Sequence, residues 1–114
     1  MNKKFTNLVR TIEVMRKEKT IVSFIKKFSD GQEMFLYGMC YWFAHILATR
    51  FDGVIYYEPV DNHFTTKIEN ELWDASGKVT LEYPDSVPWD EYKLEDALHT
   101  ARIIRDCINK DDLD

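Results

Sequence analysis

Cysteine, glycine and proline are scarce in this chain of 114 residues, and each scarcity excludes a class of protein. Two cysteines, Cys40 and Cys107, are too few for the disulfide framework of a small secreted domain. Four glycines and three prolines argue against a low-complexity or loop-rich chain. With 45% hydrophobic and 31% charged residues, the composition is that of a globular protein, and its length predicts one domain over residues 1–114.

Long apolar runs are absent too. No stretch approaches the roughly 18 apolar residues that cross a bilayer. Lys3 and Lys4 are followed by neither the apolar run nor the small-residue cleavage site of a signal peptide. We therefore expect no membrane partner and a cytoplasmic location, in a bacterium or a phage-infected cell, where both thiols stay reduced.

The charge is acidic and unevenly spread. Fifteen basic and twenty acidic residues give a net charge of −5, which disfavours electrostatic capture of nucleic acid. Residues 1–27 nevertheless hold eight basic and two acidic residues, whereas residues 82–114 are rich in acid. We expect solvated helix faces and a polar tail at about residues 110–114.

Apolar spacing predicts helices at both ends of the chain. The predicted helices cover residues 5–17, residues 20–28 with Thr20 as N-cap, residues 39–50, and a last helix from about Asp90 or Leu94 to Asn109. In the last helix, the residues expected to face the core include Leu98, Ala101 and Ile104. Residues 32–38 are expected to form a loop.

Between the helices, β-branched and aromatic residues predict strands over 54–57, 63–68 and 71–74. Residues 78–81 are expected to be a fourth short strand or an extended loop, and Pro84 and Pro88 to hold a loop. Helices that flank such strands indicate an α+β domain, with helices packed on a small antiparallel sheet.

Cys40 is the first candidate for chemistry, because it follows Gly38 and Met39 at the start of a predicted helix. Unpaired N–H groups and the helix dipole stabilise a thiolate there, and the same groups near Met39 and Cys40 are suited to hold an oxyanion. Gly38 would allow a substrate backbone to approach, and Trp42 would shield the thiol from water. We therefore assign Gly38 and Trp42 to substrate binding.

His63 and Asp74 are the next candidates. A turn at Glu69–Asn70 pairs Ile68 with Glu71, and by extension Thr65 with Asp74, so that His63 and Asp74 share one face of the hairpin. They would then be diagonal neighbours within side-chain reach. A register error of one residue would move Asp74 to the other face.

Together these residues suggest nucleophilic catalysis. Cys40 would attack a carbonyl carbon, His63 would carry the proton, and Asp74 would orient the imidazole. The spacing of Cys40, His45 and His63 does not suit a zinc site, and no bound metal is expected.

The segment Gly38-Met39-Cys40-Tyr41-Trp42-Phe43-Ala44, followed by His63-Phe64 and Leu72-Trp73-Asp74, resembles the transglutaminase-like branch of the papain-like cysteine superfamily. That resemblance covers about residues 36–80. It implies a Cys-His-Asp site for peptidase, amidase or acyl-transfer chemistry on an amide, ester or thioester, without a cofactor. Residues 61–79 also resemble small phage and bacterial proteins of unassigned function.

A second hypothesis assigns the protein a binding role. The small size and the acid surplus fit a phage or bacterial interaction module or inhibitor, in which Cys40, His63 and Asp74 are structural or vestigial. A buried cysteine often behaves as a small hydrophobic residue, so burial of Cys40 would favour this hypothesis. The protein or peptide partner is not identified by the sequence, and a homodimer is compatible with so aromatic a small domain.

Overall fold

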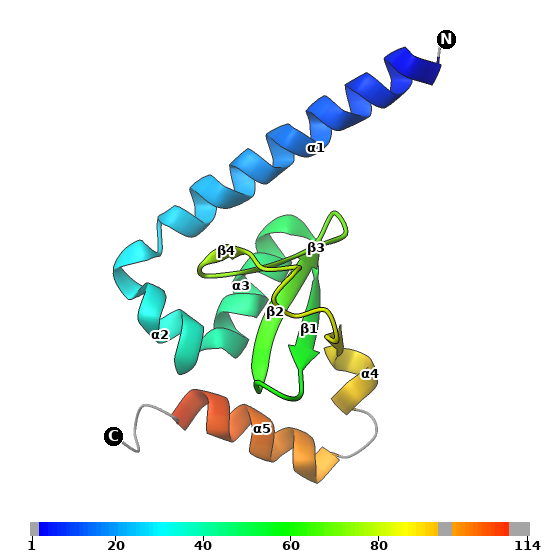
Figure 1. Ribbon diagram of the computed structural model, residues 1–114. Helices are drawn as coiled ribbons and strands as arrows, with labels where there is room; N and C mark the ends of the chain where they lie inside the picture. Colours follow the sequence, from blue (N-terminus) through cyan, green and yellow to red (C-terminus); the bar gives the residue numbers. More distant parts are fainter. Residues whose placement is uncertain (1–2, 94–96, 110–114) are drawn as a thin grey trace.

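A five-stranded antiparallel sheet forms the centre of the computed structural model, which describes residues 3–93 and 97–109 (Figure 1). The predicted α+β architecture is confirmed. The strand order is β4-β3-β2-β1-β5. The strands are β1 (Val54–Glu58), β2 (His63–Ile68), β3 (Glu71–Asp74), β4 (Gly77–Lys78) and β5 (Val87–Pro88).

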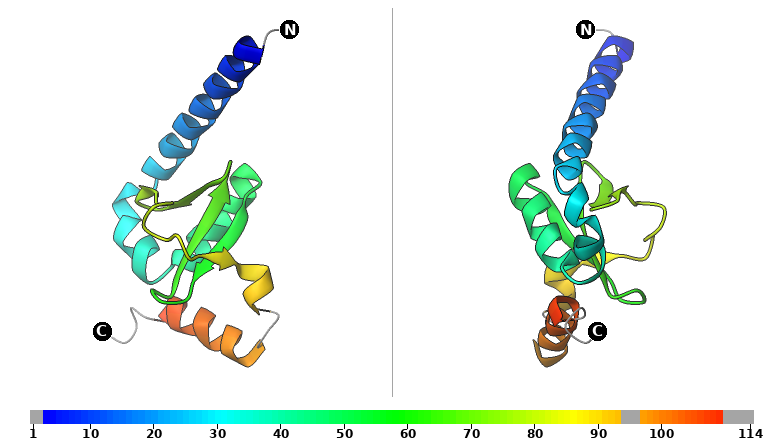
Figure 2. Two further views of the ribbon diagram at one scale, coloured as in Figure 1. Left: turned by 45° about the vertical axis from the view of Figure 1, so that its right-hand side comes forward. Right: turned by 90° about the vertical axis from the view of Figure 1, so that its left-hand side faces the viewer.

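Helices surround this sheet on several sides. They are α1 (Lys3–Lys26), the 3-10 turn η1 (Ser29–Gly31), α2 (Gln32–Tyr37), α3 (Cys40–Phe51), α4 (Trp89–Lys93) and α5 (Ala97–Asn109). Helix α3 covers one face of the sheet, and the segment 79–86 crosses the other (Figure 2). None of the helices in the described ranges has the length and hydropathy of a membrane span.

Helix α3 forms as the sequence predicts. All five residues of its expected apolar stripe are buried: Cys40, Phe43, Ala44, Leu47 and Phe51. The helix is fixed to the sheet by the Thr66 hydroxyl, which donates to the Ala44 carbonyl over 2.7 Å. Two apolar clusters result from this packing. The first is Ile21, Ile25, Phe43, Leu47, Phe51, Ile68, Trp73 and Ala75, and the second is Cys40, Ala44, Tyr57, Phe64, Trp89 and Ile103.

A tight turn joins α3 to β1. Asp52 ends the helix in the left-handed conformation, with φ of 55°. A Cβ on the next residue, Gly53, would lie 2.7 Å from the Thr66 methyl and 2.9 Å from the Lys67 carbonyl oxygen. Glycine is therefore required at this position, because a Cβ would collide with these atoms of β2. The turn reverses the chain direction, so β1 runs back alongside α3.

The hairpin of β2 and β3 confirms the predicted register. Glu69 and Asn70 both have positive φ, 51° and 66°, as in a two-residue type I′ turn. Ile68 pairs with Glu71, and Thr66 pairs with Trp73. Continuing this register places Thr65 opposite Asp74, so that His63 and Asp74 lie on one face.

The N-terminal prediction of two helices is wrong. Residues 3–26 form one helix, and Thr20, expected as an N-cap, lies inside it and donates its hydroxyl to the Arg16 carbonyl. No glycine or proline interrupts residues 16–21, so nothing in the backbone requires a break. Ile21 and Ile25 are buried against the domain, whereas the apolar residues Leu8, Val9, Ile12 and Met15 of the segment 5–17 are exposed.

Three further expectations are corrected. Residues 32–37, expected as a loop, form α2, and Val87–Pro88, expected within a loop, pair with β1 at the sheet edge. Among the α5 side chains that the structure describes, Ile103 is buried and Ile104 packs against the same cluster as expected, while Leu98 and Ala101 are exposed. The helix ends at Asn109 as predicted, but Leu94 and the tail at 110–114 lie outside the described residues.

Candidate functional site

His63 and Asp74 are joined by a buried hydrogen bond. His63 begins β2 and Asp74 ends β3, so their diagonal placement brings His63 Nε2 to 2.9 Å from Asp74 Oδ2. Both side chains are buried. With Asp74 ionised, Nε2 carries the proton and donates it, which leaves Nδ1 as the ring nitrogen that can exchange a proton.

Ser76 holds the Asp74 carboxylate from its other side. Its backbone N–H and its hydroxyl both donate to Asp74 Oδ1, over 2.8 and 2.6 Å. The turn between β3 and β4 therefore holds the Asp74 carboxylate in the orientation in which it accepts the hydrogen bond from His63. The Gln32 side chain donates to the Ala75 carbonyl in the same turn, which links α2 to this end of the sheet.

A pocket opens beside the His63–Asp74 pair. Its lining residues are Leu36, Asp61, Asn62, His63, Asp74, Ser76 and Tyr83. They come from α2, from the turn before β2, from β2 and β3, from the turn after β3, and from segment 79–86. The pocket is more polar than apolar, and two carboxylates contribute to its walls.

Tyr83, like Ser76, is a residue of this pocket that the sequence did not predict. Its ring lies 5.0 Å from the His63 ring, centroid to centroid. Partial burial raises the pKa of the Tyr83 phenol above its usual value, and the charges of Asp74, Asp61, Glu82 and Cys40 raise it further. The pattern offered no signal for this role, because Tyr83 lies in a segment without periodicity.

Cys40 opens α3 as predicted, and the topology brings it to the His63 end of the sheet. Helix α3 turns back directly into β1, and β1 turns back into β2, so the first residues of α3 and β2 lie at the same end (Figure 1). Leu36, four residues before Cys40, lines the pocket.

The Cys40 side chain is nevertheless almost fully buried. Only 3% of its surface is exposed, and it belongs to the apolar cluster that includes Ala44 and Phe64. Cys40 is not among the described residues that line the pocket. Among described contacts, the structure thus joins His63 directly to Asp74, and it places Cys40 at the same end of the sheet, in the apolar cluster and not in the pocket lining.

One backbone donor expected for an oxyanion, the Met39 N–H, is already engaged. The N–H groups of Gly38 and Met39 both donate to the Met34 carbonyl, over 3.0 and 2.8 Å. Gly38 is the buried C-cap of α2, in a right-handed helical conformation. Met39 supplies no side-chain cap to α3, and the first turn of this helix contains no acidic residue that would complement the helix dipole.

Trp42 lies away from this pocket. It is 44% exposed and lines a separate, largely apolar groove on the outer side of α3. The other lining residues of that groove are Phe24, His45, Ile46, Thr49 and Arg50. The structure therefore does not bring Trp42 to the His63–Asp74 pair, because the Trp42 side chain lies on the outward face of α3.

Metal ligands do not gather in the described part of the chain: no three His, Cys, Asp or Glu side chains there lie close enough to hold an ion. The side chain of Cys107 lies outside the described residues. His45 is on α3 and lines the Trp42 groove, apart from His63.

The comparisons with known proteins correct the family resemblance drawn from the sequence. The model of the family described as Phage YunG-like protein matches residues 8–105, and no papain-like or transglutaminase-like family is found. The assignment to that superfamily is therefore wrong, since motifs as short as Gly-x-Cys and Trp-Asp recur by chance. Searches of curated proteins and of solved structures gave no match. The match spans most of the sequence, and the chain belongs to the Phage YunG-like protein family.

Proposed function

We propose that this protein is a cysteine-dependent hydrolase or acyltransferase that acts on an amide, ester or thioester. The observation that carries the proposal is the buried His63–Asp74 pair, 2.9 Å apart, at the sheet end where Cys40 begins α3. A histidine oriented by a carboxylate, close to a thiol at a helix start, is the arrangement that activates a sulfur nucleophile.

The proposed reaction proceeds in two steps. His63 Nδ1 takes the Cys40 thiol proton while the sulfur attacks the carbonyl carbon, and the leaving group departs with that proton. Water or another nucleophile then attacks the resulting thioester, gives its proton to His63, and releases Cys40 as the thiol. Asp74 stays ionised throughout and stabilises the imidazolium.

We propose further that the protein acts in a reducing cytoplasm, in a bacterium or a phage-infected cell. The nucleophile must be a thiol rather than a disulfide, and such a compartment keeps it so. The substrate is a protein, a peptide or a smaller acyl compound that fits the pocket beside His63.

The test uses a Cys107→Ser background, in which Cys40 is the sole cysteine. The protein is mixed with a p-nitrophenyl ester, and mass spectrometry of its peptides follows an acyl group on Cys40. We expect acylation to fall at least ~100-fold in His63→Ala, because the general base is lost. His45→Ala, a histidine of α3 that lies outside the pocket, is the matched control and should acylate at the parental rate.

Two results would contradict the proposal. One is an absence of acylation in a folded parent protein. The other is an equal acylation rate in the His63→Ala and His45→Ala variants, which would show that the thiol reacts without the pair.

A binding role is the second candidate, and the burial of Cys40 favours it. A thiol that is 3% exposed within an apolar cluster has the surroundings of a packing residue. In that case His63 and Asp74 would hold the hairpin together, and the protein would act by covering a partner's surface. Wild-type biological activity in the Cys40→Ala variant would select this candidate over the enzyme.

A further inference from the structure

We propose that α1 pairs antiparallel with α1 of a second copy of this chain, through an apolar stripe that faces away from the domain. The outer stripe consists of Leu8, Ile12, Met15 and Val22. These side chains are 57%, 41%, 53% and 37% exposed, with the flanking Val9 at 38%. A single isolated hydrophobic residue on a surface is ordinary, but a row of large ones along one helix marks an interaction site.

The outer stripe is separate from the face that packs on the domain. At about 100° per residue, the stripe is centred roughly 120° around the helix from Ile21 and Ile25. Those two residues are buried in the core. Two salt bridges hold the same inner side, Lys17 to Glu69 at 2.7 Å and Lys78 to Glu18 at 3.1 Å. The domain therefore cannot cover the outer stripe.

The N-terminal half of α1 extends beyond the domain in every view (Figures 1 and 2). The molecule measures 56 × 35 × 23 Å, with a radius of gyration of 15.8 Å, whereas about 13 Å is usual for this chain length. Its accessible surface is 7905 Å², and a compact monomer of this mass exposes about 6,600 Å². The excess, about 1,300 Å², exceeds the roughly 800 Å² that each partner buries in a stable interface.

The spacing of the stripe suits a second helix of the same kind. Positions 8, 12, 15, 19 and 22 follow the alternating steps of four and three residues found along a coiled-coil seam. Lys19 is the one polar member. In an antiparallel pair centred between Ile12 and Met15, Leu8 of one copy lies opposite Lys19 of the other, whose aliphatic stem can cover it.

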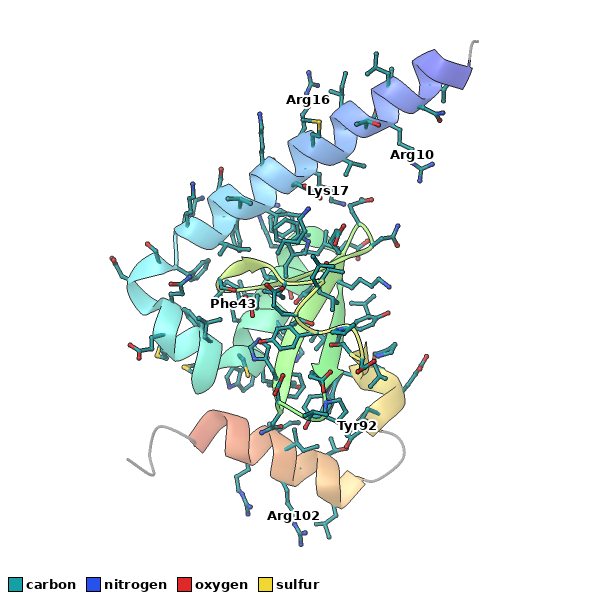
Figure 3. All side chains as sticks on the ribbon, in the orientation of Figure 1. Arg10, Arg16, Lys17, Phe43, Tyr92 and Arg102 are labelled. Carbon is teal, nitrogen blue, oxygen red and sulfur yellow. The ribbon has the colours of Figure 1, made fainter. Side chains whose placement is uncertain are left out.

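The distribution of charge favours antiparallel over parallel pairing of the two helices. It also favours a second copy of the chain, and not an anionic membrane, as the partner of the stripe. Residues 28–114 hold seven basic and eighteen acidic residues, a net charge of −11, whereas residues 1–27 carry +6. Antiparallel pairing places the basic, projecting half of each α1 beside the acidic body of the other copy. Parallel pairing would bring two basic ends together, and an anionic bilayer would repel the acidic body. Arg16 points away from the domain, toward such a partner or solvent (Figure 3).

The test measures the mass of the full chain by light scattering after gel filtration, at about 100 µM, where a dimer of micromolar affinity predominates. We expect twice the chain mass of 13.6 kDa. The variant Leu8→Glu/Met15→Glu should run as a monomer. Thr6→Glu/Thr20→Glu adds the same charge to exposed positions of α1 outside the stripe and should stay dimeric. Circular dichroism at the same concentration checks that each variant retains its helices.

Disulfide trapping then tests the orientation in the Cys107→Ser background. The pair Leu8→Cys/Lys19→Cys should cross-link two copies on oxidation, and Leu8→Cys alone should not. A disulfide from Leu8→Cys alone would overturn the antiparallel arrangement. A parent protein that is monomeric at this concentration would overturn the proposal. Monomers that sediment with phosphatidylserine vesicles would assign the stripe to a membrane surface instead.

Discussion

At the residue scale, Asp74 is the group on which the site depends. It accepts a buried hydrogen bond from His63 Nε2 and two part-buried hydrogen bonds, from the Ser76 N–H and from the Ser76 hydroxyl. Removing the carboxylate leaves the buried His63 donor without an acceptor and removes the anchor of the Ser76 turn, and an unsatisfied buried donor costs about 1–3 kcal/mol.

We therefore predict that Asp74→Ala lowers the free energy of unfolding by about 2–4 kcal/mol. Asp61→Ala, the same change at an exposed carboxylate of the same pocket, should stay within about 0.5 kcal/mol of wild type. Urea denaturation measures both. Equal stability of the two variants would show that the carboxylate network contributes nothing to the fold.

Tyr83 gives a second prediction at this scale. Partial burial and the neighbouring charge of Asp74 raise the pKa of its phenol above the usual 10.0. The neutral phenol is therefore favoured by folding. Its contribution to stability is fully present below about pH 10 and is lost as the pH rises through the higher folded pKa.

Ultraviolet difference titration of wild type against Tyr83→Phe isolates this one phenol among the six tyrosines. We expect its midpoint above pH 10, and a lower midpoint in the Asp74→Asn background, because a negative charge has been removed. A Tyr83 midpoint at or below 10 would mean that the ring is neither desolvated nor close to Asp74.

At the scale of the element, α1 has two apolar faces, of which one is buried in the domain and the other is exposed. Ile21 has no exposed surface and lies in the core, whereas Ile12 is 41% exposed on the outer stripe. We predict that Ile21→Ala costs about 2–4 kcal/mol, by loss of burial and creation of a cavity. Ile12→Ala should cost less than about 0.5 kcal/mol in dilute, monomeric protein.

Thermal or urea unfolding of both variants at low protein concentration checks this contrast. The two changes are chemically identical and lie in one helix, so helix propensity contributes equally to both. Similar losses at the two positions would mean that the outer stripe is covered by the chain's own domain.

The same helix shows where sequence reasoning fails. Its two stripes lie on different sides of one cylinder, and the assumption that both face a single core forces a break near Thr20. The β2–β3 hairpin was predictable, because its register follows from a two-residue turn and the alternation of side chains. That local register correctly placed His63 on the same face as Asp74.

The rest of the site depends on long-range packing. Tyr83 reaches His63 from a segment held by Pro84 and Pro88, and no periodicity encodes where such a segment crosses the sheet. The burial of Cys40 likewise could not be predicted, because the position of a cysteine on an apolar helix stripe is the same for a nucleophile as for a core residue. The prediction that Trp42 lies beside the thiol was wrong, because two residues that are close in a helix sequence, such as Cys40 and Trp42, point in different directions.

At the scale of the whole molecule, charge separates along the chain, with +6 in residues 1–27 and −11 in residues 28–114. If the basic half of α1 lies beside the acidic body of a second copy, salt must weaken the dimer. We predict a larger dissociation constant at about 0.5 M than at about 0.05 M salt, because attraction between exposed charges is screened. Sedimentation equilibrium measures it, and a dimer strengthened by salt would indicate a purely apolar contact.

The thiol site is the central claim, and the pH dependence of Cys40 alkylation tests it most directly. In the Cys107→Ser background, iodoacetamide should modify Cys40 rapidly down to about pH 6, well below the value near 8.5 at which an ordinary thiol titrates. His63→Ala should abolish that low-pH reactivity, and His45→Ala should preserve it. A Cys40 that reacts only after denaturation, or with the profile of an ordinary thiol in all three proteins, would contradict the account.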